Sequence, residues 1–155
     1  NGVRVILNPA PFHPVDDSVY RKIHIITPNE AEAQGLSGIK TDTMDGVERA
    51  ARFFREKGVE NVIITLGKRG IYILSEEYTG HIEAIDVGKV VDTTGAGDAF
   101  NGGLAAAIAE GKDIRQAALF GCAMSWISVT RVGTAPSIPT REEVMEVIRR
   151  YNLEV

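Results

Sequence analysis

The chain has 155 residues, of which 44% are apolar and 25% charged, and its 17 basic and 21 acidic side chains give a formal charge of −4. This length and composition predict one globular domain over residues 1–155. With no basic stripe along the sequence, we expect no nucleic-acid partner and no anionic-membrane partner. The apolar runs are also far shorter than the roughly 20 residues that span a bilayer.

The sequence holds one cysteine, Cys122, and three scattered histidines. Cys122 has no partner for an internal disulfide, and the set makes no zinc-ligand pattern. The first residues carry no basic segment followed by an apolar one, so we expect a cytoplasmic protein. Because Asn1 is not an initiator methionine and a strand-like run starts at Val3, we also expect a fragment of a longer protein.

Short runs rich in β-branched residues predict strands at residues 3–7, 23–26, 62–66 and 71–74. Near-continuous apolar strands that alternate with helical patterns are typical of an α/β fold, in which helices cover both faces of a mostly parallel sheet. Between the last two strands, residues 67–70 read Gly-Lys-Arg-Gly, which predicts a turn and a hairpin at the sheet edge.

Capping residues and a glycine predict where the first two helices begin or end. Thr27 is predicted to cap the first helix, with Pro28 in the first helical position and Glu30 completing a capping box. The second helix runs from about Asp45 to Lys57 and ends at a glycine, with its apolar residues at helical spacing.

Three more helices are predicted in the second half of the chain. Residues 97–110 are small and apolar on most sides, which predicts a buried helix. A capping box at 113–116 opens the next helix, whose small residues favour close packing on the previous one. A third box at 140–143 opens an amphipathic helix that ends near residue 150.

The most unusual stretch is residues 90–103, where an apolar pair leads into a glycine-rich turn and then a helix. The N–H groups of Gly95, Ala96 and Gly97, at the positive end of the helix dipole, predict a site for the oxygens of a phosphate. The turn matches neither the Walker A pattern nor the dinucleotide fingerprint, because Phe100 stands where the latter needs a glycine.

Asp98 follows this turn, in the first turn of the predicted helix. It could serve only the helix dipole, which is worth roughly 0.3–1 kcal/mol. A carboxylate beside an anion site would otherwise repel the phosphate, unless it takes a proton from a hydroxyl that attacks that phosphate. The pairing therefore favours phosphoryl transfer.

The run Asp92-Thr93-Thr94-Gly95-Ala96-Gly97-Asp98-Ala99-Phe100 resembles the signature of the ribokinase-like (phosphofructokinase-B) carbohydrate kinases. Further runs resemble motifs of that family in the same order, nearly from end to end of the chain: residues 7–11, 27–32, 65–70 and 137–139, the last after Gly133. The resemblance implies a ribokinase-like fold and ATP-dependent phosphorylation of a primary hydroxyl of a sugar, ribose first.

In this resemblance Asp98 is the base, and the amides of Gly95, Ala96 and Gly97 form the anion hole. The residues that lie along ATP would be Thr65, Leu66, Gly67, Lys68, Arg69 and Gly70, which is compatible with the hairpin turn expected there. Cys122 falls where the family contacts adenine, and otherwise it is a small buried residue of a helix.

Asn29 and Glu32 match the family's N-x-x-E motif, which implies a role in holding Mg²⁺, its waters and a phosphate oxygen. The alternative for Glu32 is a solvated carboxylate on an exposed helix face. A monovalent-cation site, for K⁺, is implied at Asp92, Thr94, Ser128, Arg131, Gly133 and Ser137, with Arg131 contributing its carbonyl oxygen. The alternative there is a simple loop between two helices.

Members of the family are roughly twice as long as this chain, and the half that it lacks carries most sugar contacts and a lid that commonly forms a homodimer. We therefore expect the chain alone to be inactive or weak, although it would bind nucleotide. A non-catalytic nucleotide-binding module is the competing interpretation. Among enzymes, a kinase for fructose, a nucleoside or a vitamin alcohol is the alternative.

Overall fold

The computed structural model describes residues 2–155, which form two compact units, one ending at Glu83 and the other spanning Ala84–Val155. The first unit contains a five-stranded sheet with three helices, and the second contains three helices and their connecting loops.

The sheet of the first unit follows chain order. Its strands are β1 (Ile6–Leu7), β2 (Ile25–Ile26), β3 (Asn61–Thr65), β4 (Ile71–Leu74) and β5 (Thr79–Ile82). Strands β1, β2 and β3 pair in parallel, whereas β3, β4 and β5 pair antiparallel. The α/β class and the hairpin of β3 and β4 are confirmed. The sheet is mixed, because the hairpin adds β4 antiparallel to β3, and β5, which the sequence did not predict, continues this antiparallel side to the edge.

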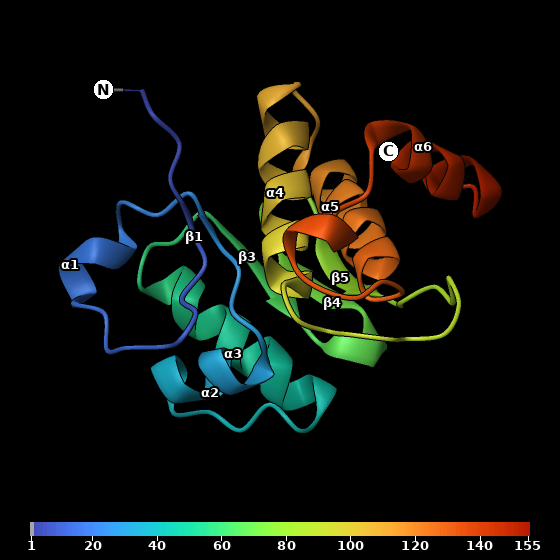
Figure 1. Ribbon diagram of the computed structural model, residues 1–155. Helices are drawn as coiled ribbons and strands as arrows, with labels where there is room; N and C mark the ends of the chain where they lie inside the picture. Colours follow the sequence, from blue (N-terminus) through green and yellow to red (C-terminus); the bar gives the residue numbers. More distant parts are fainter. Residues whose placement is uncertain (1) are drawn as a thin grey trace. The chain divides into compact units, whose positions relative to one another are not determined.

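The helices of the first unit are α1 (Asp17–Tyr20), α2 (Glu30–Ser37) and α3 (Met44–Glu56). Helices α2 and α3 lie side by side, and both contact the sheet (Figure 1). The predicted apolar face of α3 is fully buried, with Val47, Ala50, Ala51 and Phe54 packed into one core with strand residues such as Val62. The helix ends at Glu56, and its C-cap Lys57 is followed by a glycine with φ +102°, close to the end that the sequence predicted.

Helix α2 begins two residues later than the sequence predicted. Its N-cap is Asn29, whose side chain accepts from the N–H of Glu32, while the Glu32 carboxylate accepts from the N–H of Asn29, both at 2.8 Å. Thr27 instead continues the pairing of β2, with its N–H and its hydroxyl both donating to the carbonyl of Leu7. The capping box predicted at Thr27 and Glu30 is therefore wrong, because pairing in the sheet holds Thr27 outside the helix.

The second unit contains α4 (Ala96–Ala109), α5 (Ile114–Ser128) and α6 (Arg141–Arg150). Both predicted capping boxes, at Asp113 of α5 and Thr140 of α6, are present. Helices α4 and α5 pack along most of their length, and α6 contacts α5 (Figure 1). At the crossing, a Cβ added to Gly121 would stand 2.7 Å from the carbonyl oxygen of Phe100. The predicted close packing of these two helices is confirmed.

Helix α4 is buried on one face only. Ala99, Phe100, Gly103, Leu104 and Ala107 are buried, and the residues on the opposite side are exposed: Gly102, Ala105, Ala106 and Ala109. The predicted burial of this helix therefore holds for the face that packs on α5, and the opposite face is exposed.

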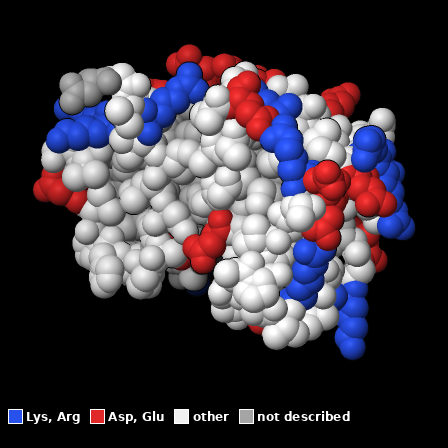
Figure 2. Space-filling model, turned by 45° about the horizontal axis from the view of Figure 1, so that its top comes forward, with Lys and Arg blue, Asp and Glu red and all other residues white. Residues whose placement is uncertain are grey.

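Charged side chains of both signs are mixed on the surface. Figure 2 shows blue and red side chains next to one another on the face drawn there. Several form ion pairs within one unit, among them Arg49 with Asp45 and Arg141 with Glu110. Among residues 2–155, no helix is both long and apolar enough to cross a membrane.

Candidate functional site

The glycine-rich turn of the second unit leads directly into α4. Gly95 is the N-cap and has left-handed backbone angles, φ 79° and ψ 3°, which a glycine adopts without strain. The N–H of Ala96 donates to the carbonyl of Thr93 at 3.2 Å. Within the described part of the chain, the N–H groups of Gly95, Gly97 and Asp98 have no hydrogen-bond partner. These free donors at a helix N-terminus can bind an anion.

Asp98 lies in the first turn of α4 and is exposed. Among residues 2–155 its carboxylate has no hydrogen-bond or ion-pair partner. A carboxylate without a partner, one residue after a free N–H group, can accept a proton from a hydroxyl bound beside the anion. The free N–H groups and the carboxylate without a partner therefore lie within residues 95–98, the turn that the sequence predicts to carry the chemistry.

Asp92 connects the turn with the loop after α5. Its two carboxylate oxygens accept from the N–H of Thr94 at 2.9 Å and from the N–H of Gly133 at 3.0 Å. Hydrogen bonds from the Thr94 side chain, and then from the two backbone amides, lower the pKa of Asp92. The carboxylate is therefore ionised at neutral pH, and it brings together two of the segments predicted to hold a monovalent cation.

The remaining residues of that predicted cation site lie at the end of α5 and in the following loop. Ser128 and Ser137 are buried, and their hydroxyls donate to the carbonyls of Ser125 and Thr134. The guanidinium of Arg131 pairs with Glu143 of α6, at 2.5 Å from its carboxylate. The side chain of Arg131 is thus engaged elsewhere, in keeping with a role for its carbonyl alone.

In the first unit, the structure brings together the residues predicted to face ATP and Mg²⁺. Asn29 and Thr65 form a parallel β-bridge, and the N–H of Thr65 donates to the carbonyl of Pro28 at 2.9 Å. Leu66 begins the turn that follows, and its N–H donates to the carbonyl of Gly70 at 2.8 Å. The N-terminus of α2 therefore lies beside the start of the 66–70 turn.

The 66–70 turn presents two cations in different ways. Lys68 is exposed at its tip, within the short 3₁₀ helix η1 (Gly67–Arg69). Arg69 instead turns its guanidinium to Glu30 of α2, at 2.5 Å, and to the carbonyl of Thr41, at 3.2 Å. Lys68 is therefore the more exposed of the two cations of the turn.

Glu32 is buried, with 8% of its surface exposed, and one carboxylate oxygen completes the capping box of α2. The alternative of a solvated carboxylate on an exposed face is therefore wrong. Within residues 2–155 no group of three or more His, Cys, Asp or Glu side chains could hold a metal ion. A cation at the residues predicted here would be held through its own waters and backbone oxygens in addition to single carboxylates.

Cys122 lies in the middle of α5 and is buried. Burial raises the pKa of its thiol, which keeps the thiol neutral and unreactive. The interpretation as a small buried helix residue is confirmed, and the predicted contact with adenine stays a prediction.

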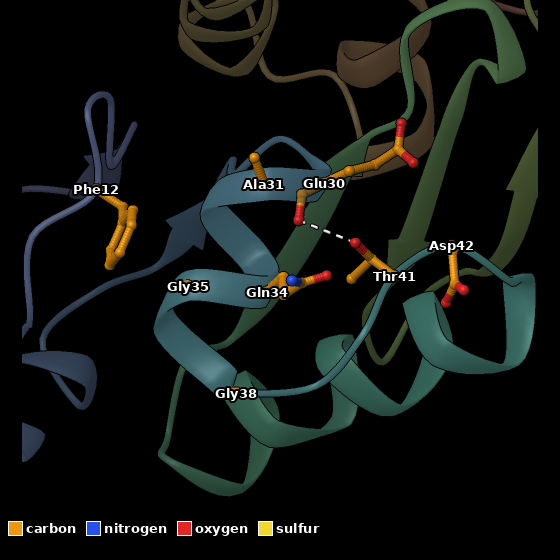
Figure 3. Close-up of a pocket in the computed structure, with 8 residues that line it drawn as sticks. All are labelled: Phe12, Glu30, Ala31, Gln34, Gly35, Gly38, Thr41 and Asp42. Atoms are coloured by element: carbon orange, nitrogen blue, oxygen red, sulfur yellow. Dashed lines mark hydrogen bonds between the residues drawn. The ribbon is translucent and has the colours of Figure 1, made fainter.

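A hollow of about 590 Å³ opens on the first unit (Figure 3), and two residues that line it, Glu30 and Thr41, hydrogen-bond to Arg69 of the predicted ATP turn. The ionisable side chains that line it are the carboxylates of Glu30 and Asp42, which would repel a phosphate. Its lining is Phe12, Glu30, Ala31, Gln34, Gly35, Gly38, Thr41 and Asp42. This chemistry does not suit a nucleotide, so we place the functional site at the predicted turns instead.

Sequence reasoning missed the partners of Arg69, which are Glu30 and Thr41, and of the Arg69 carbonyl, which is Nε2 of His81, 2.5 Å away. These residues are separated from Arg69 by 12 to 39 positions. No local pattern relates them. Complementary charge at positions 30 and 69 was the one signal present in the sequence.

Residues 1–141 match the model of the family described as pfkB family carbohydrate kinase. The chain belongs to this family. Over 148 residues this chain is 43% identical to a ribokinase of Haemophilus influenzae, and the match covers 96% of this chain and 48% of the relative. A deoxyribokinase of Salmonella typhi is 36% identical over 149 residues, with 96% and 48% covered.

Solved structures described as ribokinases are also similar to this chain. A ribokinase of Thermotoga maritima superposes with a TM-score of 0.87 at 41% identity, covering 96% of this chain and 50% of that one. An Arabidopsis thaliana ribokinase complexed with ribose and ATP gives 0.89 at 32% identity, with 96% and 48% covered. A putative ribokinase II of E. coli in complex with ATP and Mg²⁺ gives 0.75 at 33% identity, with 86% and 42% covered. This pfkB chain spans about half the length of the relatives it matches.

Proposed function

We propose that the chain is the nucleotide-binding half of an ATP-dependent sugar kinase, which phosphorylates the primary hydroxyl of D-ribose to give ribose 5-phosphate. The observation that carries the proposal is the unpartnered carboxylate of Asp98 in the first turn of α4, next to the free N–H groups of Gly95 and Gly97. Relatives described as ribokinases, one of them complexed with ribose and ATP, support the choice of reaction and acceptor.

In the proposed reaction, Asp98 accepts the proton of the sugar hydroxyl as its oxygen bonds to the γ-phosphorus of ATP. The bond from that phosphorus to the bridging oxygen breaks, and ADP leaves. The N–H groups of Gly95 and Gly97 donate to the oxygens of the phosphoryl group in transfer. In the anion hole predicted over residues 95–97, the N–H of Ala96 is the one that already has an internal acceptor. General-base catalysis of this kind is worth about 10²–10⁴ in rate.

Other residues of the chain would hold ATP, Mg²⁺ and a monovalent cation. Asn29 and the turn from Thr65 to Gly70 would face ATP, with Cys122 near the adenine. Asn29 and Glu32 would hold Mg²⁺, which neutralises phosphate charge when bound. Asp92, with oxygens of Thr94, Ser128, Arg131, Gly133 and Ser137, would supply an all-oxygen donor set for K⁺.

Two features of the comparisons favour alternatives. The deoxyribokinase relative, at 36% identity, supports 2-deoxyribose as a second candidate acceptor. The coverage of only about half of each relative supports a chain that binds nucleotide without catalysing transfer by itself, because the acceptor would be neither oriented nor shielded from water.

The test uses the full-length protein that contains this chain, incubated with ATP, Mg²⁺ and either ribose, 2-deoxyribose or 5-deoxyribose, and phosphorus NMR identifies the product. We expect phosphorus coupled to the C5 protons with ribose, and no sugar phosphate with 5-deoxyribose, which lacks the primary hydroxyl. The 155-residue chain alone should bind ADP·Mg²⁺ in a calorimetric titration but transfer phosphate far more slowly. A product phosphorylated on another hydroxyl, or no sugar-dependent ADP formation, would refute the proposal.

A further inference from the structure

Arg69 connects three separate pieces of the first unit. Its guanidinium donates to the carboxylate of Glu30, the first residue of α2, at 2.5 Å and to the carbonyl of Thr41 at 3.2 Å. Its own carbonyl oxygen lies 2.5 Å from Nε2 of His81 on β5. One residue of the 66–70 turn is therefore fixed at both ends, by its side chain and by its backbone.

Thr41 closes this arrangement into a triangle. It is buried, with 3% of its surface exposed, and its hydroxyl donates to the backbone carbonyl of Glu30 at 3.0 Å, as the dashed line in Figure 3 shows. Its carbonyl accepts from Arg69. Glu30 is thus bound through its side chain to Arg69 and through its backbone to Thr41. Three residues far apart in the sequence hold one another by hydrogen bonds.

The pieces held in this way are the ones that carry the predicted nucleotide contacts of the first unit. The turn that Arg69 belongs to contains Gly67 and Lys68, and Glu30 directly follows Asn29, the N-cap of α2. A shift of the turn relative to α2 would change the spacing between these two sets of contacts. Both hydrogen bonds come from Nη2 of Arg69. Because the guanidinium stays charged and is weakly hydrated, it suits this partly exposed connection better than the ammonium of Lys would.

We propose that Arg69 and Glu30 are positioning residues, which hold the 66–70 turn at a set distance from the N-terminus of α2 so that both can face one nucleotide. In this proposal Arg69 acts through Glu30 and Thr41, to which its Nη2 donates, and not through a phosphate, and its Nη1 lies 3.9 Å from Sδ of Met44. The proposal rests on the proposed function for the identity of the ligand. The connection between turn and helix does not depend on it.

The experiment compares Arg69→Ala, Glu30→Gln and the double variant in the 155-residue chain. Amide hydrogen exchange without nucleotide reports on the N–H groups of Leu66 and Gly70, which close the turn, and of Glu32 in the capping box. Calorimetry with ADP·Mg²⁺ reports affinity. The control is Arg49→Ala, which also removes one arginine from an ion pair of the same unit, but on the exposed surface of α3.

We expect each single variant to speed exchange at Leu66 and Gly70 and to weaken ADP·Mg²⁺ binding, by roughly three- to tenfold, as for a partly exposed charged hydrogen bond. The double variant should be no worse than Arg69→Ala, because both changes break the same connection. Exchange in the middle of α3 should stay unchanged, which separates local loosening from a general loss of stability. Arg49→Ala should alter neither measurement.

Three results would overturn the proposal: unchanged exchange in the turn, additive effects in the double variant, or exchange that rises equally throughout the unit. Loss of affinity with unchanged exchange would mean that Arg69 touches the nucleotide directly, which also contradicts it. If the unaltered chain bound no ADP·Mg²⁺, the proposed function would fail, while the exchange measurements would still decide whether the turn is held.

Discussion

At the scale of single residues, Glu143 shows how one carboxylate can hold two elements. It completes the capping box of α6 with Thr140, and it also pairs with Arg131 in the loop after α5. The hydrogen bond from Arg131, followed by that from the Thr140 amide, lowers the pKa of Glu143 to about 2. This carboxylate thus fixes a loop that carries part of the predicted cation site.

The lowered pKa predicts a dependence of stability on pH. The pKa of Glu143 is below its value of 4.5 in a free side chain, so its stabilisation is complete above about pH 4.5 and is lost as the pH falls toward 2. In Glu143→Gln, the unfolding temperature should therefore fall less than in the unaltered chain between pH 5 and pH 2, as measured by circular dichroism. The neighbouring variant Glu142→Gln is the control. Parallel curves for Glu143→Gln and the unaltered chain would contradict this assignment.

Residue-level patterns predicted some caps and missed one. The capping boxes at Asp113 and Thr140 were predicted correctly because each cap residue follows a loop and is not held by pairing in the sheet. Near residue 27 the sequence predicted a box of Thr27 with Glu30, whereas the structure has one of Asn29 with Glu32. The outcome depends on the bonds of Thr27 to Leu7, 20 residues away, which no local pattern contains. The pair of Arg69 and Glu30 was unpredictable for the same reason.

At the scale of elements, the crossing of α4 and α5 depends on glycines that have no room for a side chain. A Cβ at Gly121 would meet the carbonyl oxygen of Phe100 at 2.7 Å, and that atom belongs to the backbone of the facing helix. Gly102, in contrast, lies on the exposed face of α4 and has nothing within 4 Å of an added Cβ. Two glycines in packed helices therefore differ sharply in their surroundings.

This contrast predicts opposite effects for the same substitution. Gly121→Ala should lower the free energy of unfolding by about 1–3 kcal/mol, because the helices must separate. Gly102→Ala should raise it by about 0.5–1 kcal/mol, because alanine favours the helix and touches nothing. Urea unfolding measures both. Equal effects of the two substitutions would mean that the helices do not approach as closely as described.

Elements were predicted best where apolar periodicity is strong. The amphipathic pattern of α3 and the apolar runs of β3 and β4 gave the right type and nearly the right bounds. Strand β5, with a glycine and a histidine among its four residues, has no apolar run to reveal it, and it is held by pairing with β4. Helix α4 was predicted, but its exposed face was not, since small apolar residues on most sides of a helix indicate burial.

At the scale of the whole molecule, the order of motifs along the chain predicted the family, and the match over residues 1–141 confirms it. The residues proposed to bind ligands fall in two sets: Asn29 and the 66–70 turn belong to the first unit, and the 95–98 turn and Asp92 belong to the second. The sequence names these residues by their resemblance to family motifs, and the structure describes the local geometry of each set.

The central claim is that Asp98 takes the proton of the attacking hydroxyl beside the free amides of its turn. Asp98→Asn in the full-length protein removes the base and keeps the shape, so kcat for ribose phosphorylation should fall by about 10²–10⁴, while the Kd of ATP should stay nearly unchanged. Steady-state kinetics and equilibrium titration of the same preparation give both numbers. A variant that keeps kcat within tenfold of the unaltered enzyme would contradict the account.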